Sequence, residues 1–171
     1  MRKLAPLVAL LSLLLTACYS STTMLLDPSA ARQPWPSSTW TETRMSETKT
    51  FRATKRSDGW YDYVQQNTDR KWDEYRVLLN DLGTVNGHTL YAYGTHLKPS
   101  DGEGAFIYGV VVALPGGKWK VVTPDCENAV AAGIAKSRST GKCMFANRAQ
   151  LLDALREYAS TPQFWKEVAE P

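Results

Sequence analysis

The asparagine–glycine pair Asn86-Gly87 is the sequence feature that most constrains the fold. Both central residues of a type I′ turn need a positive φ, and Asn-Gly between two alternating stretches is the strongest short-range signal for a β-hairpin. Residues 72–82 lead into the pair, and residues 88–97 follow it with apolar and polar side chains in alternation. The chain is therefore predicted to contain an antiparallel sheet with this hairpin inside it.

Further strands are predicted on both sides of the hairpin, separated by short turns. Glycine and proline mark these turns, as at Ser57-Asp58-Gly59 and Pro115-Gly116-Gly117. Six strands joined in this way indicate an antiparallel meander, either a curled sheet or a small open barrel. The predicted strands are residues 47–55, 60–64, 72–82, 88–97, 105–114 and 118–123.

The spacing of apolar residues changes after residue 123, from the period of strands to that of helices. An alanine-rich stretch over residues 126–136 is expected to form a short helix. Asn147 occupies the N-cap position of a clearer helix, with Gln150 three residues later as in a capping box. Thr161-Pro162 begins a last short helix. Strands followed by helices indicate an α+β fold in which two to three C-terminal helices pack on the sheet.

The first 17 residues have the layout of a secretory signal peptide. Arg2 and Lys3 give a positive start, residues 4–15 are almost entirely apolar, and small residues precede Cys18. The apolar run is shorter than the roughly 20 residues that a membrane-spanning helix needs. We expect residues 1–17 to be removed as a signal peptide.

The end of this leader, Leu15-Thr16-Ala17-Cys18, resembles the lipobox of bacterial lipoproteins. The resemblance implies that Cys18 is lipidated and becomes the first residue of the mature chain, attached to the membrane by acyl chains. In enterobacteria an aspartate after this cysteine favours the inner membrane. Tyr19 stands there, so the resemblance implies the outer membrane, facing the periplasm. The alternative is an ordinary secretory leader, with Cys18 a plain thiol.

Residues 18–45 are rich in serine, threonine and proline and have no sustained period. They are predicted to be the lipidated N-terminus and a tether that carries the domain away from the membrane. Trp35 and Trp40 are unusual for a linker and are expected to pin the far end of the tether onto the domain rather than to bind a ligand. Residues 46–171 are predicted to form a single β-rich domain.

The mature chain is expected to be nearly neutral. The whole sequence has 20 Lys and Arg and 17 Asp and Glu; Arg2 and Lys3 leave with the leader, so 18 positive residues remain against 17 negative ones. Domains that bind nucleic acid usually carry a clear basic excess. Nucleic acid is therefore not expected as a partner.

Cys126 and Cys143 remain as a pair once Cys18 is assigned to the lipid. Paired cysteines in an oxidising compartment predict a disulfide, here closing a loop of roughly 18 residues and stabilising the fold by about 3 kcal/mol. The alternative is a catalytic thiol at Cys126, at the start of a predicted helix, where the helix dipole favours a thiolate. Exported cysteine peptidases that trim cell-wall peptides use such a cysteine. In that family the histidine follows the cysteine, whereas His88 and His96 precede Cys126.

No metal site or other cofactor is expected. His88 and His96 are eight residues apart, which on a straight strand corresponds to roughly 26 Å. No further histidine exists to complete a ligand set.

Aromatic residues on neighbouring predicted strands are the candidate ligand or partner surface. A curled sheet would let them line a cavity for an apolar ligand or glycan, and a flat sheet would present them to a partner protein as Tyr and Trp anchors. A third interpretation places them in the core under the helices. The residues are Tyr61, Tyr63, Tyr91, Tyr93, Tyr108 and Trp119.

The sequence thus predicts a lipid-anchored envelope protein that acts by binding or structural association, with an envelope protein as partner, and not an enzyme. One alternative is a carrier of a small apolar ligand or glycan in an aromatic-lined β cavity. The other is a cell-wall-directed hydrolase that uses Cys126.

Overall fold

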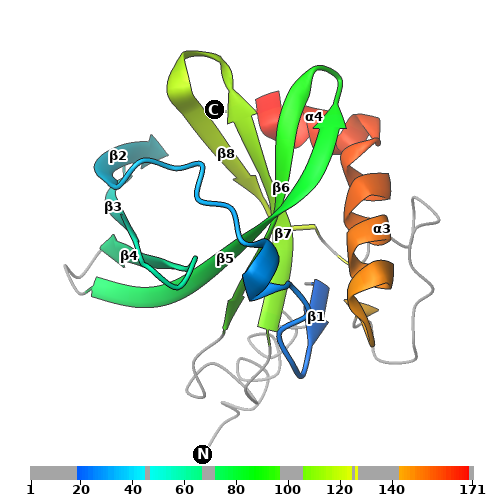
Figure 1. Ribbon diagram of the computed structural model, residues 1–171. Coiled ribbons are helices and arrows are strands. Elements are labelled where there is room, and N and C mark those ends of the chain that lie inside the picture. The colour runs from blue at the N-terminus through cyan, green and yellow to red at the C-terminus, as the bar shows by residue number, and fades with distance from the viewer. Residues whose placement is uncertain are drawn as a thin grey trace, which may run out of the picture.

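The computed structural model describes residues 19–44, 47–66, 72–96, 106–124, 126 and 143–169. It shows an α+β fold in which a strongly curled sheet packs against two helices (Figure 1). The named strands are β1 (Tyr19–Ser21), β2 (Ser38–Arg44), β3 (Glu47–Lys55), β4 (Tyr61–Gln66), β5 (Trp72–Val85), β6 (His88–His96), β7 (Phe106–Leu114), β8 (Lys118–Val122) and β9 (Cys143–Met144).

The sheet is mostly an antiparallel meander. Its strand order is β2-β3-β4-β5-β6-β7-β1-β9, and β8 also pairs with β7. The strands β3 to β8 correspond to the six predicted ones, whereas β1, β2 and β9 are additional, so the predicted count of six is too low. The single parallel pair in the described sheet joins β1 to β9. The end strands β2 and β9 do not pair with each other, so the described sheet is curled but open.

The hairpin between β5 and β6 forms at the predicted Asn-Gly pair. Asn86 has a φ of 50° and Gly87 a φ of 78°, which are the positive values that the turn requires. The pairing of the two strands shifts register between Asp81 and Gly83. The Gly83 N–H donates to Asp81 Oδ1 at 2.9 Å at this irregularity, which bends the long strand β5.

Two helices follow the sheet, α3 (Arg148–Ala159) and α4 (Pro162–Ala169), and both begin as predicted. The side chain of Asn147 accepts the N–H of Gln150 at 3.0 Å, so it is the N-cap of α3. Thr161 Oγ1 accepts the N–H of Phe164 at 3.2 Å at the start of α4. The expected helix at residues 126–136 lies, apart from Cys126, outside the described residues.

Each face of the sheet carries its own buried core. The first core lies between the sheet and the helices and includes Leu78, Leu90, Tyr108 and Leu155. The second lies on the other face, inside the curl. Side chains alternate across a strand, so β5, β6 and β7 supply residues to both cores. The second core contains Trp35, Ala53, Tyr61, Val77, Leu79, Tyr93 and Val111.

The prediction of a tether over residues 18–45 needs correction, because residues 19–44 belong to the folded domain. Strand β1 pairs with β7, strand β2 pairs with β3, and Leu26 and Trp35 are buried. A three-residue strand has no measurable period, and its partner β7 is almost ninety residues away in the chain. Local composition therefore indicated a linker where non-local pairing makes a strand.

Candidate functional site

Aromatic side chains gather on the inner face of the curl around Trp35. Its ring centroid lies 5.2 Å from that of Tyr61 and 6.2 Å from that of Trp119, and Tyr91 is 6.2 Å from Trp119 in turn. Trp35 belongs to the chain between η1 (Pro28–Ala30) and β2, which crosses the front of the curl in Figure 1. We refer to residues 31–37 as the Trp35 segment.

Hydrogen bonds hold the Trp35 segment along its length. The Tyr61 hydroxyl donates to the Trp35 carbonyl at 3.0 Å, and Ser37 Oγ accepts the Lys55 N–H at 3.1 Å. Gln33 Nε2 donates to the carbonyls of Arg56 and Trp60 at 2.8 and 2.9 Å.

The Trp35 side chain is only 6% exposed, and its Nε1–H has no hydrogen-bond partner among the residues that the structure describes. The protein therefore fills the aromatic interior with its own tryptophan, and burial raises the pKa of the Tyr61 hydroxyl beside it.

The six aromatic residues singled out from the sequence do not form one surface. Five contribute to the inner face, where Tyr61 and Tyr93 are buried and Tyr63, Tyr91 and Trp119 are half-buried at the rim. Tyr108 lies in the other core, under the helices. The interpretation of a core under the helices is thus confirmed for Tyr108, whereas Tyr61 and Tyr93 are buried in the second core, inside the curl.

Tyr93 and Tyr108 face opposite sides because they belong to successive pairs of the β6–β7 ladder, and in each pair the partner is a glycine. Tyr93 is in register with Gly109, and Tyr108 with Gly94. A Cβ on Gly109 would lie 2.5 Å from Tyr93 Cε1, and one on Gly94 would lie 3.0 Å from Tyr108 Cε1. Each ring therefore covers the neighbouring glycine, and neither glycine position has room for a side chain without a shift of its neighbours.

The Tyr108 hydroxyl fixes the chain that follows β1. It accepts the N–H of Leu25 at 2.9 Å, donates to the carbonyl of Thr23 at 3.0 Å and lies 2.7 Å from Ser21 Oγ. Burial raises the pKa of Tyr108. This residue is a structural anchor, a role that no local sequence pattern indicates.

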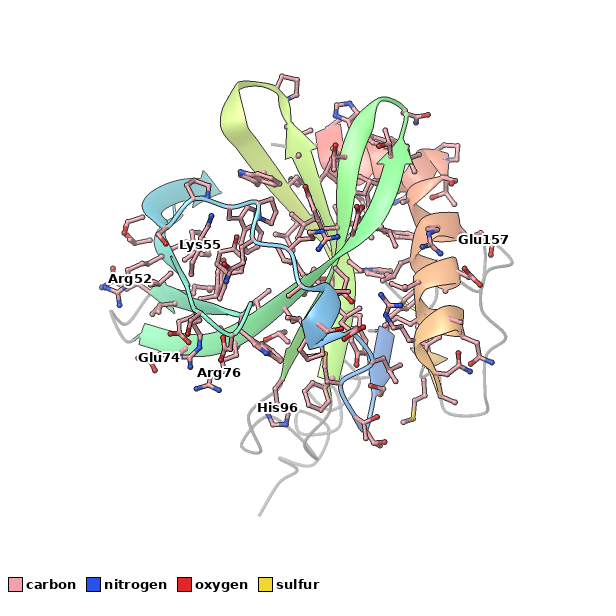
Figure 2. The ribbon with its side chains drawn as sticks, in the orientation of Figure 1. Arg52, Lys55, Glu74, Arg76, His96 and Glu157 are labelled. Atoms are coloured by element: carbon pink, nitrogen blue, oxygen red, sulfur yellow. A yellow bond between two sulfur atoms is a disulfide. The ribbon has the colours of Figure 1, made fainter. Side chains whose placement is uncertain are left out.

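Charged side chains line a shallow hollow of about 590 Å³ on the outer face of β3, β4 and β5. Asp62 forms ion pairs with Arg56 at 3.2 Å and Arg76 at 4.0 Å. In Figure 2, Arg52, Glu74 and Arg76 point away from the sheet. Opposite charges neutralise one another here, so the hollow has no field of one sign that would select an ionic ligand.

The two histidines lie at opposite ends of β6 and each packs on an aromatic ring. His88 is 5.2 Å from Trp165 and His96 is 4.8 Å from Phe106, measured between ring centroids. Within the part of the chain that the structure describes, no three His, Cys, Asp or Glu residues are grouped to hold a metal ion.

Cys126 and Cys143 form the predicted disulfide, with their Cα atoms 5.6 Å apart. Both residues are buried in the core under the helices. A thiolate is the nucleophile of cysteine enzymes. Cys126 has no free thiol in this state, and a catalytic role would first require reduction.

Strand β1 places the first described residue directly in the core. Tyr19 is fully buried, pairs with Tyr108 in β7 and Cys143 in β9, and packs on Phe145 with ring centroids 4.9 Å apart. Burial raises the pKa of Tyr19 from 10.0 to about 12, and the charge of Glu157 adds to the shift. The predicted lipidation residue, Cys18, lies outside the described residues.

No protein-family model, curated protein or solved structure matches this chain. Neither helix of the described sheet-and-helix domain is long and apolar enough to cross a membrane.

Proposed function

We propose that this protein is a lipid-anchored component of the bacterial cell envelope, attached through Cys18 to the outer membrane and facing the periplasm. It acts by binding or structural association and not by catalysis. The observation that carries the proposal is the leader, in which a basic start and an apolar run end at Leu15-Thr16-Ala17-Cys18. The Cys126–Cys143 disulfide supports an oxidising compartment.

The rim of the curl is the surface that we propose for an envelope protein partner. Tyr63, Tyr91 and Trp119 are half-buried there, beside the filled interior. Half-buried Tyr and Trp side chains on a rigid sheet offer a large contact area at a low entropic cost, and these residue types dominate the energy of protein interfaces.

The anchor is tested by the intact mass of the protein extracted from its native membrane, measured with and without reduction before alkylation. We expect acyl mass on Cys18, and two alkylated thiols that appear only after reduction. Cys18→Ser is the matched control and should lose the acyl mass and the membrane attachment. A chain that keeps its leader, or that begins at another residue without acyl mass, contradicts the proposal.

The partner surface is tested with a photo-crosslinking amino acid at Tyr91 and, as a control, at the exposed Glu74 of the outer face. We expect discrete crosslinked products in intact cells from position 91 only. Equal products from both positions, or none from position 91, rule out the rim as a partner surface.

A second candidate function is that of a carrier for a small apolar ligand or glycan. The aromatic lining of the curl favours it, because Trp35, Tyr61, Tyr91 and Trp119 surround one interior. The Trp35 segment must then leave before a ligand enters. Protease cleavage within residues 31–37 that is accelerated by an added apolar ligand supports this function, and cleavage that no ligand affects argues against it.

A further inference from the structure

We infer that the sheet edge formed by β1 and β9 lies against the lipid bilayer, with Met144 facing the membrane. This inference rests on the proposed lipid anchor at Cys18. It assigns the surface of the domain that the anchor holds at the membrane.

The first step is that the folded domain begins with strand β1, directly after the proposed anchor residue Cys18. A flexible tether over residues 18–45 would allow a root-mean-square reach of about 30 Å. Tyr19 is instead fully buried and paired on both sides within the sheet. A peptide bond joins it to Cys18, so their Cα atoms are about 3.8 Å apart. An acylated Cys18 would therefore bring the membrane to β1 itself.

The second step is the direction of the side chains along this edge. Tyr19 and Cys143 are a register pair, and both point into the core under the helices. Side chains alternate along a strand, so the next pair, Ser20 and Met144, points the other way. Ser20 is also in register with Ile107, which is half-buried.

The third step is the chemistry of this face. Among the described residues, two large apolar side chains are exposed, Val121 at 45% and Met144 at 48%. A single exposed apolar residue on a protein surface is ordinary. Met144 is different in its position, because it is paired with the second residue after the proposed acyl attachment. Acyl chains on Cys18 that insert into the bilayer would keep the Met144 side chain close to the lipid, so its contact with the membrane becomes an intramolecular event with a high effective concentration.

The test uses the full lipidated protein purified from its membrane and reconstituted in phosphatidylethanolamine–phosphatidylglycerol vesicles. A fluorescent amino acid replaces Met144 in one variant and Glu74 in the other. Glu74 is the control, because it is exposed on the outer face of β5, far from β1 in the strand order. With nitroxide-bearing lipids, we expect at least threefold stronger quenching at position 144. Equal quenching at the two positions overturns the inference.

A second variant tests the contact between the β1–β9 edge and the membrane separately from the lipid anchor. Ten Gly and Ser residues are inserted between Cys18 and Tyr19, and the thermal unfolding midpoint confirms that the domain still folds. We expect unchanged flotation with the vesicles and a loss of most of the quenching at position 144. Quenching that the insertion leaves unchanged overturns the inference while the anchor stands. Failure of the original protein to float with vesicles overturns the proposed anchor and this inference together.

Discussion

The side-chain amide of Asn80 pairs with the backbone of Asp27 in both directions. Asn80 Oδ1 accepts the Asp27 N–H at 2.8 Å, and Asn80 Nδ2 donates to the Asp27 carbonyl at 2.9 Å. Arg148 at the start of α3 donates to the same Oδ1 at 3.3 Å. One fully buried amide on β5 thus holds both the chain after β1 and the first turn of the helix layer.

Replacing Asn80 should therefore cost more than the loss of one side chain. In Asn80→Ala, the Asp27 N–H loses its acceptor in a partly buried place, and the Asp27 C=O keeps only the Ala30 N–H of its two donors. We expect the free energy of unfolding to fall by about 2–4 kcal/mol. Urea unfolding measures the change. Thr84→Ser, an exposed position on the same strand, should change it by less than about 0.5 kcal/mol. A loss of similar size in both variants would refute this role of Asn80.

Two tyrosine hydroxyls should respond to removal with opposite signs. Tyr108→Phe leaves the Leu25 N–H without its acceptor, and we expect a loss of about 1–3 kcal/mol. Tyr19→Phe removes a buried hydroxyl that has no hydrogen-bond partner within the described part of the chain, so stability should stay equal or rise by up to about 1 kcal/mol. Chemical denaturation of the two variants at neutral pH measures both effects. A destabilised Tyr19→Phe would show that this hydroxyl does contribute to the fold.

Stability should decrease in alkaline solution because of the buried tyrosines. The pKa of Tyr19 is 10.0 when exposed and about 12 in the fold, so the unfolded chain releases this proton first as the pH rises. The stabilisation is complete below pH 10 and is lost between pH 10 and about 12. Unfolding curves recorded across this range should show a shallower decline for Tyr19→Phe. An identical decline in both proteins would remove Tyr19 as a cause.

Shortening Trp35 should open the interior of the curl. Trp35→Ala removes a large buried ring, and we expect a loss of about 3–5 kcal/mol. A dry apolar cavity of this kind binds small aromatic molecules, so added benzene or indole should raise the unfolding midpoint of this variant. Trp35→Phe is the matched control, with a loss below about 1.5 kcal/mol and little gain from indole. Equal responses of the two variants to indole would show that no cavity forms.

Breaking the disulfide should destabilise the domain by about 3 kcal/mol, because the bridge restricts the conformational entropy of the unfolded chain. The two cysteines are 17 residues apart in the sequence. The double variant Cys126→Ala/Cys143→Ala and the wild type under reducing conditions should unfold alike. A wild type that keeps its unfolding midpoint in reducing agent, with both thiols shown to be free, contradicts the estimate.

Local signals in the sequence predicted local structure well. The turn at Asn86-Gly87 and the cap at Asn147 depend on neighbouring residues only, and both form as expected. Strand β1 could not be predicted in this way, because its partners in β7 and β9 are distant in the chain.

The candidate site was predictable in composition but not in arrangement. Composition alone singles out the tyrosines of β4 and β6 as candidates. Their placement is not local information, because Tyr93 and Tyr108 can be assigned to opposite faces only when the register between β6 and β7 is known. Asn80 gave no signal at all, since an asparagine in a strand is read as an exposed or turn residue until its partner at Asp27 is known.

The pairing of β1 also sets an order of events during folding. Tyr19 is among the first residues of the domain to be synthesised, but its partners Tyr108 and Cys143 follow roughly 90 and 124 residues later. This strand therefore cannot pair on both sides until residue 143 of the 171-residue chain has been synthesised. Contacts of such long range make folding slow. A chaperone that shields the N-terminal strand would thus act during the interval when this protein is most exposed to aggregation.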